Sequence, residues 1–302
     1  MSPPSRPRRS LLYMPASNAR ALEKAQGLPA DGLIFDLEDA VAPAAKVEAR
    51  SGAVAAARSG RYGSREIFIR VNGLDTSWAA DDLRAAASSA ADALLLPKAN
   101  SADDVRRAIA LLADAGAPAS QLLWAMMETP RGILAAAELA RVNESLPTPR
   151  FGGFVVGTAD LAKDLHCAHP ADRWTMSFAL QQCVMAARAH DLGVIDGVFF
   201  DLNDEDGFAR SCRQGRELGF DGKTLIHPKQ IAVANATFAP LPADIAHARR
   251  VIAAHAQARA QGQGVTLLDG KLVEILHVAE AERLLAQAEA IARLEAGHAP
   301  AA

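Results

Sequence analysis

Two acidic residues, Glu128 and Asp160, each follow a short apolar segment of the kind that forms a buried strand. Glu128 comes directly after Trp124-Ala-Met-Met, and Asp160 follows Val155-Val-Gly-Thr-Ala. Because the carboxyl ends of neighbouring parallel strands meet at one edge, we expect the two carboxylates to lie close together. One or two carboxylates, completed by water and substrate oxygens, are a typical Mg²⁺ site. The pair therefore predicts magnesium as cofactor, with helix capping as the alternative for each residue alone.

Other charged and polar residues follow further predicted strands and are expected to share the same mouth: Tyr13, Asp36, Glu38, Asp39, Arg70, Lys98, Asp196 and His227. So many carboxylates would repel one another unless a cation lay among them, which supports the magnesium prediction. For Asp36, Glu38 and Asp39 the alternative is helix capping or a salt-bridge network with Lys46 and Arg50.

Two basic residues of this set have distinct expected roles. Arg70 lies in an apolar strand, so its guanidinium must meet a buried partner or point into the mouth. In the mouth it would clamp a carboxylate or stabilise an enolate-type oxygen, and an ion pair with Asp36 or Glu38 is a compatible alternative. Lys98 has the chemistry for a Schiff base, but surrounding carboxylates oppose the lowered pKa that this needs. We assign Lys98 as a structural charge partner.

Eight short apolar segments alternate with amphipathic helical stretches over about 225 residues. The segments are 11–14, 32–37, 67–71, 93–96, 122–127, 153–156, 194–199 and 224–226. Strand–helix alternation indicates right-handed crossovers and a parallel sheet, and eight repeats predict an α/β fold of the closed (β/α)₈ TIM-barrel type. The sequence has neither the glycine pattern of a dinucleotide-binding fold nor a P-loop.

Three parts are expected along the chain: a disordered tail 1–8, a catalytic barrel 9–228 and a C-terminal extension 229–302. The extension reads as a helix over 243–260, a hairpin over 265–273 with Asp269-Gly270 at its turn, and a helix over 278–294. Because the extension follows the eighth strand, the barrel does not need it. We expect a lid or an arm that reaches a neighbouring subunit.

The composition of the chain limits the classes of partner that the protein is expected to bind. The net charge of −3 and the aromatic content of 5% argue against a nucleic-acid surface. No apolar run approaches the roughly 20 residues of a membrane helix. The three cysteines are odd in number and scattered, which favours a reducing cytosol over a disulfide framework. We therefore expect a cytoplasmic protein with no nucleic-acid or membrane partner.

Several ordered motifs run from about residue 9 to 294. They are Arg9-Ser-Leu-Leu-Tyr-Met-Pro-Ala, Phe35-Asp-Leu-Glu-Asp-Ala-Val, Ile69-Arg-Val-Asn-Gly, Leu95-Leu-Pro-Lys, Met127-Glu-Thr, Gly157-Thr-Ala-Asp-Leu and Gly222-Lys-Thr-Leu-Ile-His-Pro-Lys-Gln. Together they resemble the citrate lyase β-subunit-like family of the HpcH/HpaI aldolase superfamily, which includes malyl-CoA lyases and malyl-CoA thioesterases. The resemblance implies a barrel assembled as a homotrimer or hexamer, with Mg²⁺ held by Glu128 and Asp160.

The resemblance also implies residue roles. Substrate binding falls to Tyr13, Lys24, Arg70, Glu128, Ala159, Ile226 and His227, and catalysis to Arg70, Glu38 and Glu274. Tyr13 and Lys24 would lie near the CoA moiety, where Asn18 replaces a basic residue that other members use for phosphate contact.

The late hairpin departs from the lyases that it resembles. In malyl-CoA lyases it carries a catalytic Asp that enters the neighbour's active site. Here the stretch is Gly270-Lys-Leu-Val-Glu274, in which the acid is one methylene longer and the usual Pro is absent. This departure is similar to the malyl-CoA thioesterase branch.

We therefore predict a Mg-dependent carbon–carbon lyase that acts through an enolate on a short 3-hydroxyacyl-CoA thioester of the malyl-CoA or citramalyl-CoA type. One alternative is a (3S)-malyl-CoA thioesterase that uses the same site, with Glu274 steering water toward the thioester. The other is a non-catalytic subunit that binds CoA esters. Intact Glu128, Asp160 and Arg70 argue against that last alternative.

Overall fold

The computed structural model describes residues 6–297, which fall into two compact units. One unit spans Arg8–Phe238, and the other holds the described residues from Ala239 onward together with residues 6–7. Residues 1–5 of the predicted tail lie outside the described residues. Arg8, which we assigned to that tail, is instead fixed by an ion pair of 2.6 Å between its Nε and Glu66 Oε2.

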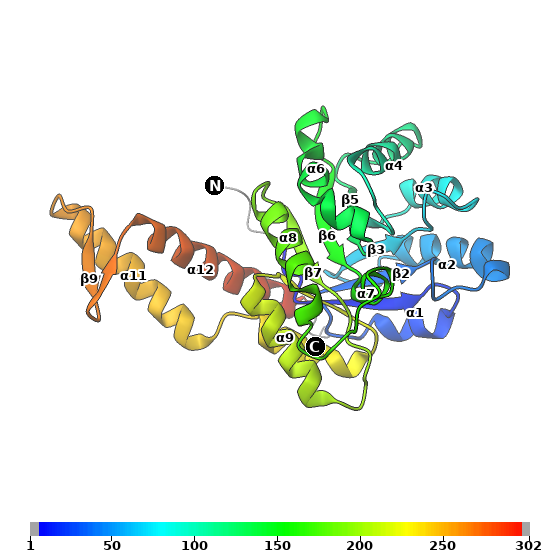
Figure 1. Cartoon of the computed structure of the whole chain (residues 1–302). Coiled ribbons are helices and arrows are strands. Elements are labelled where there is room, and N and C mark those ends of the chain that lie inside the picture. Colours follow the sequence, from blue (N-terminus) through cyan, green and yellow to red (C-terminus); the bar gives the residue numbers. More distant parts are fainter. Residues whose placement is uncertain (1–5, 298–302) are drawn as a thin grey trace. The chain divides into compact units, whose positions relative to one another are not determined.

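Eight parallel strands close into a barrel in chain order, which confirms the predicted (β/α)₈ fold (Figure 1). They are β1 Ser10–Pro15, β2 Gly32–Asp36, β3 Glu66–Arg70, β4 Ala93–Leu96, β5 Leu122–Met127, β6 Phe151–Val156, β7 Gly193–Asp196 and β8 Gly222–Leu225. The prediction extended the seventh strand to residue 199. Phe199 lies beyond the strand and packs against the helix layer, with the centre of its ring 6.0 Å from that of Phe208. Its apolar side chain therefore reflects this packing and not membership of a strand.

Helices follow the strands and surround the barrel (Figure 1). They are α1 Ala19–Ala25, α2 Lys46–Arg58, α3 Ala79–Ala87, α4 Ala102–Asp114, α5 Pro130–Leu134, α6 Ala136–Ala140, α7 Thr158–Asp164, α8 Ser177–Arg188, α9 Glu205–Leu218 and α10 Ile231–Phe238. Helix α4 shows how the sequence directs this layer. Ser101 caps its first turn by accepting the N–H of Asp104, and a stripe at helical spacing is buried, with Val105, Ile109 and Leu112 on it.

Alternate strand residues fill the interior of the barrel. Leu11, Ile34, Phe68, Leu95, Trp124, Val155 and Ile195 belong to this inner cluster. The indole of Trp124 occupies the space that a Cβ on Gly152 or Gly193 would need, so glycine is required at both positions. Two residues further along their strands, Tyr13, Asp36, Arg70 and Met126 follow the same alternation. Because every second strand residue faces inward, a layer that contains Asp36 and Arg70 lies next to the apolar residues that fill the interior of the barrel.

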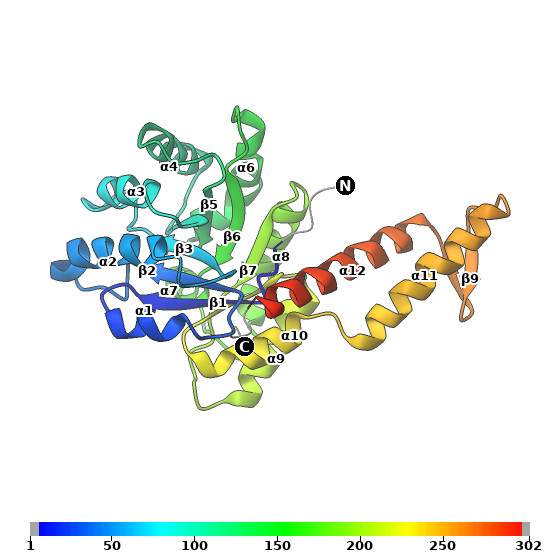
Figure 2. The ribbon, with the colours of Figure 1, turned by 180° about the vertical axis from the view of Figure 1, so that it is seen from behind.

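The second unit is a helix–hairpin–helix, as predicted. It contains α11 Pro242–Ala260, β9 Thr266–Leu268, β10 Lys271–Val273 and α12 Ile275–Ala296, with the two helices side by side (Figure 2). Asp269 and Gly270 both have positive φ, 52° and 76°, as a tight hairpin turn requires. Helix α12 begins three residues before the predicted position because Glu274 and His277 form a capping box.

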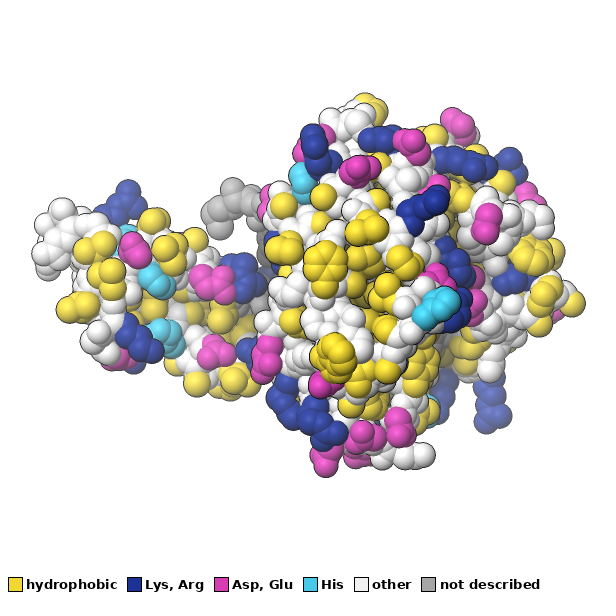
Figure 3. Space-filling model, in the orientation of Figure 1, with side chains coloured by type: hydrophobic (Ala, Val, Ile, Leu, Met, Phe, Trp, Pro, Cys, Tyr) yellow, Lys and Arg dark blue, Asp and Glu magenta, His cyan; other side chains and the backbone are white. Residues whose placement is uncertain are grey.

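The surface of the barrel unit is partly apolar. Figure 3 shows hydrophobic side chains gathered on the face that carries α8. The large exposed apolar residues of this region include Trp174, Phe178 and Met185. In residues 6–297, no helix combines the length and the apolar character that crossing a membrane requires.

Candidate active site

Arg70 lies at the centre of a charged network in the mouth of the barrel. Its Nε donates to Asp36 Oδ1 at 2.7 Å and its Nη2 to Asp36 Oδ2 at 2.6 Å. Its Nη1 lies 2.8 Å from Glu38 Oε2 and 3.8 Å from Asp39 Oδ2. Burial opposes the charge of Arg70, but Tyr13 and the carboxylates of Asp36 and Glu38 outweigh it and raise its pKa. The guanidinium is therefore permanently charged and held in one plane.

The alternative of a salt-bridge network between these carboxylates and Lys46 and Arg50 does not hold. The ammonium of Lys46 donates to two backbone carbonyls, of Leu37 at 2.9 Å and of Glu38 at 2.8 Å. Arg50 pairs with Asp82 instead, at 2.6 Å. The reason is geometric, because the loop after β2 turns its carbonyl groups toward α2 and its carboxylates toward Arg70.

Lys98 links two carboxylates of the mouth. Its backbone N–H donates to Glu128 Oε1 at 2.7 Å, and its Nζ donates to Glu38 Oε1 at 2.6 Å. Burial opposes the charge of Lys98, but the hydrogen bond and the charge of Glu38 outweigh it and raise its pKa. A Schiff base needs a neutral amine, so this environment disfavours that chemistry. The assignment of Lys98 as a charge partner agrees with these contacts.

Glu128 follows β5 and is 1% exposed. Its Oε1 accepts the Lys98 N–H, and its Oε2 has no hydrogen-bond donor among residues 6–297. A Cβ on Gly157 would lie 2.5 Å from Oε2, so glycine leaves room for this oxygen. Burial, and then the charge of Glu38, raise the pKa of Glu128 to about 7. Helix capping is not its role, because Thr129 caps α5.

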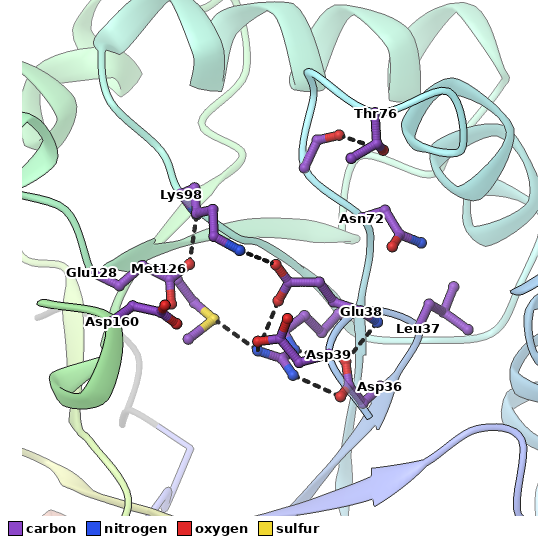
Figure 4. Close-up of polar contacts among 12 residues, drawn as sticks. Asp36, Leu37, Glu38, Asp39, Asn72, Thr76, Lys98, Met126, Glu128 and Asp160 are labelled. Atoms are coloured by element: carbon purple, nitrogen blue, oxygen red, sulfur yellow. Dashed lines mark hydrogen bonds and ion pairs between the residues drawn. The ribbon is translucent and has the colours of Figure 1, made fainter. Parts of the chain in front are cut away.

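Asp160 lies in the first turn of α7, beside Glu128 in Figure 4, and its charge contributes to the raised pKa of Glu128. Its Oδ1 is 3.1 Å from Lys163 Nζ. Residues 6–297 hold no group of three or more His, Cys, Asp or Glu suited to a metal ion. Two carboxylates without nitrogen or sulfur ligands fit a hard cation that keeps water or substrate oxygens in its other positions, as Mg²⁺ does. They do not fit a structural zinc site.

Tyr13 and Met126 complete the wall around Arg70. The guanidinium carbon of Arg70 lies 4.9 Å from the centre of the Tyr13 ring, a cation–π arrangement. Met126 Sδ is 3.7 Å from Arg70 Nη1 and 3.8 Å from the Tyr13 hydroxyl. The sequence interpretation missed Met126. Its position two residues after inward-facing Trp124 was the signal that would have found it.

Four residues that we predicted to bind substrate are exposed. Lys24 lies in α1, Ala159 in α7, and Ile226 and His227 follow β8. The ring of His227 accepts the N–H of Lys229 at 3.1 Å and begins a 3₁₀ turn. Within residues 6–297, these four side chains make no hydrogen bond or ion pair with the Arg70 network. Their role in binding stays a prediction.

Asp196 does not belong to the mouth, contrary to the prediction. It is fully buried, and its carboxylate lies 2.7 Å from Lys223 Nζ and 2.5 Å from Arg173 Nη1. Burial opposes its charge, but Lys223 and Arg173 outweigh it and lower the pKa of Asp196. The preceding Ile195 points into the barrel, so the Asp196 side chain points outward, toward Gly215 of α9.

Glu274 belongs to the C-terminal unit. It precedes α12, and its backbone N–H donates to His277 Nδ1 at 3.2 Å in the capping box. Its predicted catalytic role stays a prediction, since Glu274 lies outside the barrel unit.

A (β/α)₈ barrel with two carboxylates and a clamped arginine at the carboxyl ends of its strands is typical of metal-assisted enzymes. Residues 9–228 match the HpcH/HpaI aldolase/citrate lyase family. The chain belongs to this family, which confirms the resemblance found in its motifs.

Three relatives show how far the similarity extends. The (3S)-malyl-CoA thioesterase of Cereibacter sphaeroides is 49% identical, over 98% of this chain and 100% of its own. The L-malyl-CoA/beta-methylmalyl-CoA lyase of the same species is 34% identical, over 96% of this chain and 97% of its own. The crystal structure of CitE from Mycobacterium tuberculosis with magnesium, acetoacetate and coenzyme A has a TM-score of 0.75 and 30% identity, and covers 94% of this chain and 98% of that one.

Proposed function

We propose that this protein is a (3S)-malyl-CoA thioesterase that uses magnesium. The observation that carries this proposal is the charged network in the mouth of the barrel. It holds Arg70 through Asp36 and Glu38, and it also includes Glu128. The sequence alone favoured a lyase. The thioesterase now comes first because that relative is 49% identical along nearly the whole chain, whereas the lyase is 34% identical.

Glu128 and Asp160 are the residues that would hold Mg²⁺. A bound Mg²⁺ would polarise substrate oxygens and help to orient a carboxylated acyl group. Two observations support this assignment: Glu128 Oε2 accepts no hydrogen bond from residues 6–297, and the Asp160 carboxylate lies beside Glu128 (Figure 4). Magnesium and coenzyme A are also named as ligands of the M. tuberculosis relative.

Arg70 would stabilise the oxygen that becomes negative when the thioester carbonyl is attacked. Its plane is fixed before substrate arrives, so no reorganisation is needed as charge develops. In the hydrolysis, a water oxygen bonds to the thioester carbon, the C–S bond breaks, and malate and CoA leave. Glu274 would steer that water toward the thioester, as predicted from the sequence; in this step it would also take the water's proton and pass it to the departing thiolate. The longer acid at this position supports hydrolysis over carbon–carbon cleavage.

The second candidate is the lyase, which the 34% identical malyl-CoA lyase supports. It would use the same arginine to stabilise an acetyl-CoA enolate formed when the Cα–Cβ bond breaks. Both reactions share the residues of the mouth, so their products distinguish them.

The test uses purified full-length protein with (3S)-malyl-CoA and magnesium, and follows free thiol, malate, glyoxylate and acetyl-CoA by mass spectrometry. We expect free CoA and malate in equal amounts. Glyoxylate and acetyl-CoA in equal amounts would identify the lyase instead. Binding of the ester without any product would identify a CoA-ester-binding subunit. Glu128→Gln serves as the inactive control in each assay.

A further inference from the structure

Lys98 has a backbone conformation that its residue type disfavours. It follows β4 and Pro97, and its φ is +50°, in the left-handed region where a side chain is strained and glycine fits freely. Lysine has no special tolerance for this region, unlike Asn or Asp. Non-glycine residues held in such conformations cluster at functional sites, where the surrounding contacts compensate the strain.

The conformation allows one residue to reach two carboxylates at once. The backbone N–H of Lys98 meets Glu128 Oε1 at 2.7 Å, while its ammonium meets Glu38 Oε1 at 2.6 Å (Figure 4). The second oxygen of Glu38 lies 2.8 Å from Arg70 Nη1. Glycine would satisfy the turn and the backbone bond but would have no ammonium. A lysine at this position therefore serves both contacts.

We propose that Lys98 is a positioning residue with two separable functions. Its backbone holds the carboxylate of Glu128, and its side chain holds Glu38, which in turn orients Arg70. The inference rests on the proposed function and deepens it, because it joins the carboxylate that would hold the cation to the arginine that would stabilise the oxyanion. Fixed neighbours of this kind keep catalytic groups within the narrow range of productive geometry.

The two functions predict different effects for different variants. Lys98→Met keeps the length and backbone preference of lysine but removes the charge, so Glu38 loses one of its two cationic partners. We expect its kcat to fall about tenfold, while Mg²⁺ alone binds no more weakly than to the wild type. Lys98→Arg should restore more than half of kcat, because it returns a cation. Lys98→Val strongly disfavours positive φ and should weaken Mg²⁺ binding about tenfold as well.

Asp191→Val is the matched control for backbone strain. Asp191 is an exposed residue with φ +54° outside the mouth. We expect this variant to lose thermal stability but to keep the Mg²⁺ affinity and kcat of the wild type. Calorimetry with Mg²⁺ alone measures the affinities, CoA release from malyl-CoA measures kcat, and circular dichroism verifies folding.

Three outcomes would overturn the proposal. A Lys98→Met protein with wild-type kcat would show that the ammonium positions nothing, and this arm stands even if Lys98→Val does not fold. A folded Lys98→Val protein with wild-type Mg²⁺ affinity would show that the backbone bond does not position Glu128. Equal losses of kcat and affinity in Lys98→Met, Lys98→Val and Asp191→Val would indicate a general structural effect. If the wild type releases no CoA, the proposed function fails, whereas the Mg²⁺ titrations still test this inference.

Discussion

Asp36 and Arg70 are paired in register across β2 and β3 and meet through two parallel hydrogen bonds of 2.7 and 2.6 Å. Such a bidentate pair fixes the plane of the guanidinium as well as its charge. The pair leaves Nη1 to Glu38 and Met126 Sδ. The orientation of Arg70 is therefore set by two adjacent strands of the barrel, and this rigidity is what the first prediction tests.

Arg70→Lys should lower kcat about a hundredfold, the scale of losing one preorganised oxyanion donor. Lysine keeps the charge but loses the planar fork that Asp36 holds. Steady-state kinetics with malyl-CoA separate the effect on kcat from that on KM. A variant that raises KM and leaves kcat unchanged would mean that Arg70 contributes uniform binding and no transition-state selectivity.

Glu128→Gln should abolish both divalent binding and turnover, because it removes a ligand charge without changing side-chain volume. The fold should persist, since a neutral amide is easier to bury than a carboxylate. Calorimetry with Mg²⁺ and thermal unfolding check the two halves of this expectation. Retention of more than about a tenth of wild-type kcat/KM, a loss below ~1.4 kcal/mol, would contradict the ligand assignment.

Mg²⁺ binding should depend on pH through Glu128, whose pKa is raised to about 7 by burial and by the charge of Glu38. A raised pKa means that the carboxyl is protonated below about pH 7, so the cation must displace a proton there. We expect the apparent affinity to fall about tenfold per pH unit below 7 and to level off above it. Glu38→Gln removes the repelling charge and should move the fall to lower pH. Titrations at a series of pH values that give a flat profile in both proteins would contradict this assignment.

Asp196→Asn should destabilise the barrel by about 3–5 kcal/mol, because Lys223 and Arg173 would lose the buried carboxylate that pairs with both. Mg²⁺ affinity should not change, since Asp196 faces α9. Urea unfolding and calorimetry measure the two effects. The control is Glu280→Gln, which breaks an exposed ion pair with Arg283 and should cost less than about 1 kcal/mol. A loss of Mg²⁺ affinity in Asp196→Asn would place this carboxylate back in the mouth.

We propose that the protein is a homo-oligomer in which Glu274 acts on the barrel of a neighbouring subunit. Glu128→Gln and Glu274→Ala should each be inactive alone, and mixing them should restore part of the activity, because hybrid oligomers contain some sites with both groups intact. Native mass spectrometry checks that subunits exchange. Exchange without recovered activity would mean that the extension serves its own barrel or is structural.

Glu274→Asp tests the chemistry of the same residue. Shortening the acid by about one C–C bond should favour carbon–carbon cleavage over CoA release, since the resemblance to the malyl-CoA lyases implies an Asp there. The measurement is the ratio of glyoxylate to free thiol. An unchanged ratio would remove the support that Glu274 gives to the thioesterase.

The sequence by itself determined the barrel and several of the charged residues that gather in its mouth. One apolar run ends at Glu128 and another ends shortly before Asp160. Such runs are local signals, so they can be recognised in the sequence without knowing which segments pack against them. The same holds for the Asp269-Gly270 turn, whose two residues tolerate positive φ. Motif order then identified the family, although not the reaction.

Tertiary structure alone decided which charged groups are partners. Arg70 meets Asp36 because strands β2 and β3 pair in that register, and Lys46 meets carbonyl groups because the loop after β2 turns them toward α2. Neither relation follows from spacing, since loop conformation and register depend on packing over the whole barrel. Lys98 is the clearest case. Its type indicated a charge partner, but only the folded backbone, at positive φ, brings its N–H to Glu128 and its ammonium to Glu38 together.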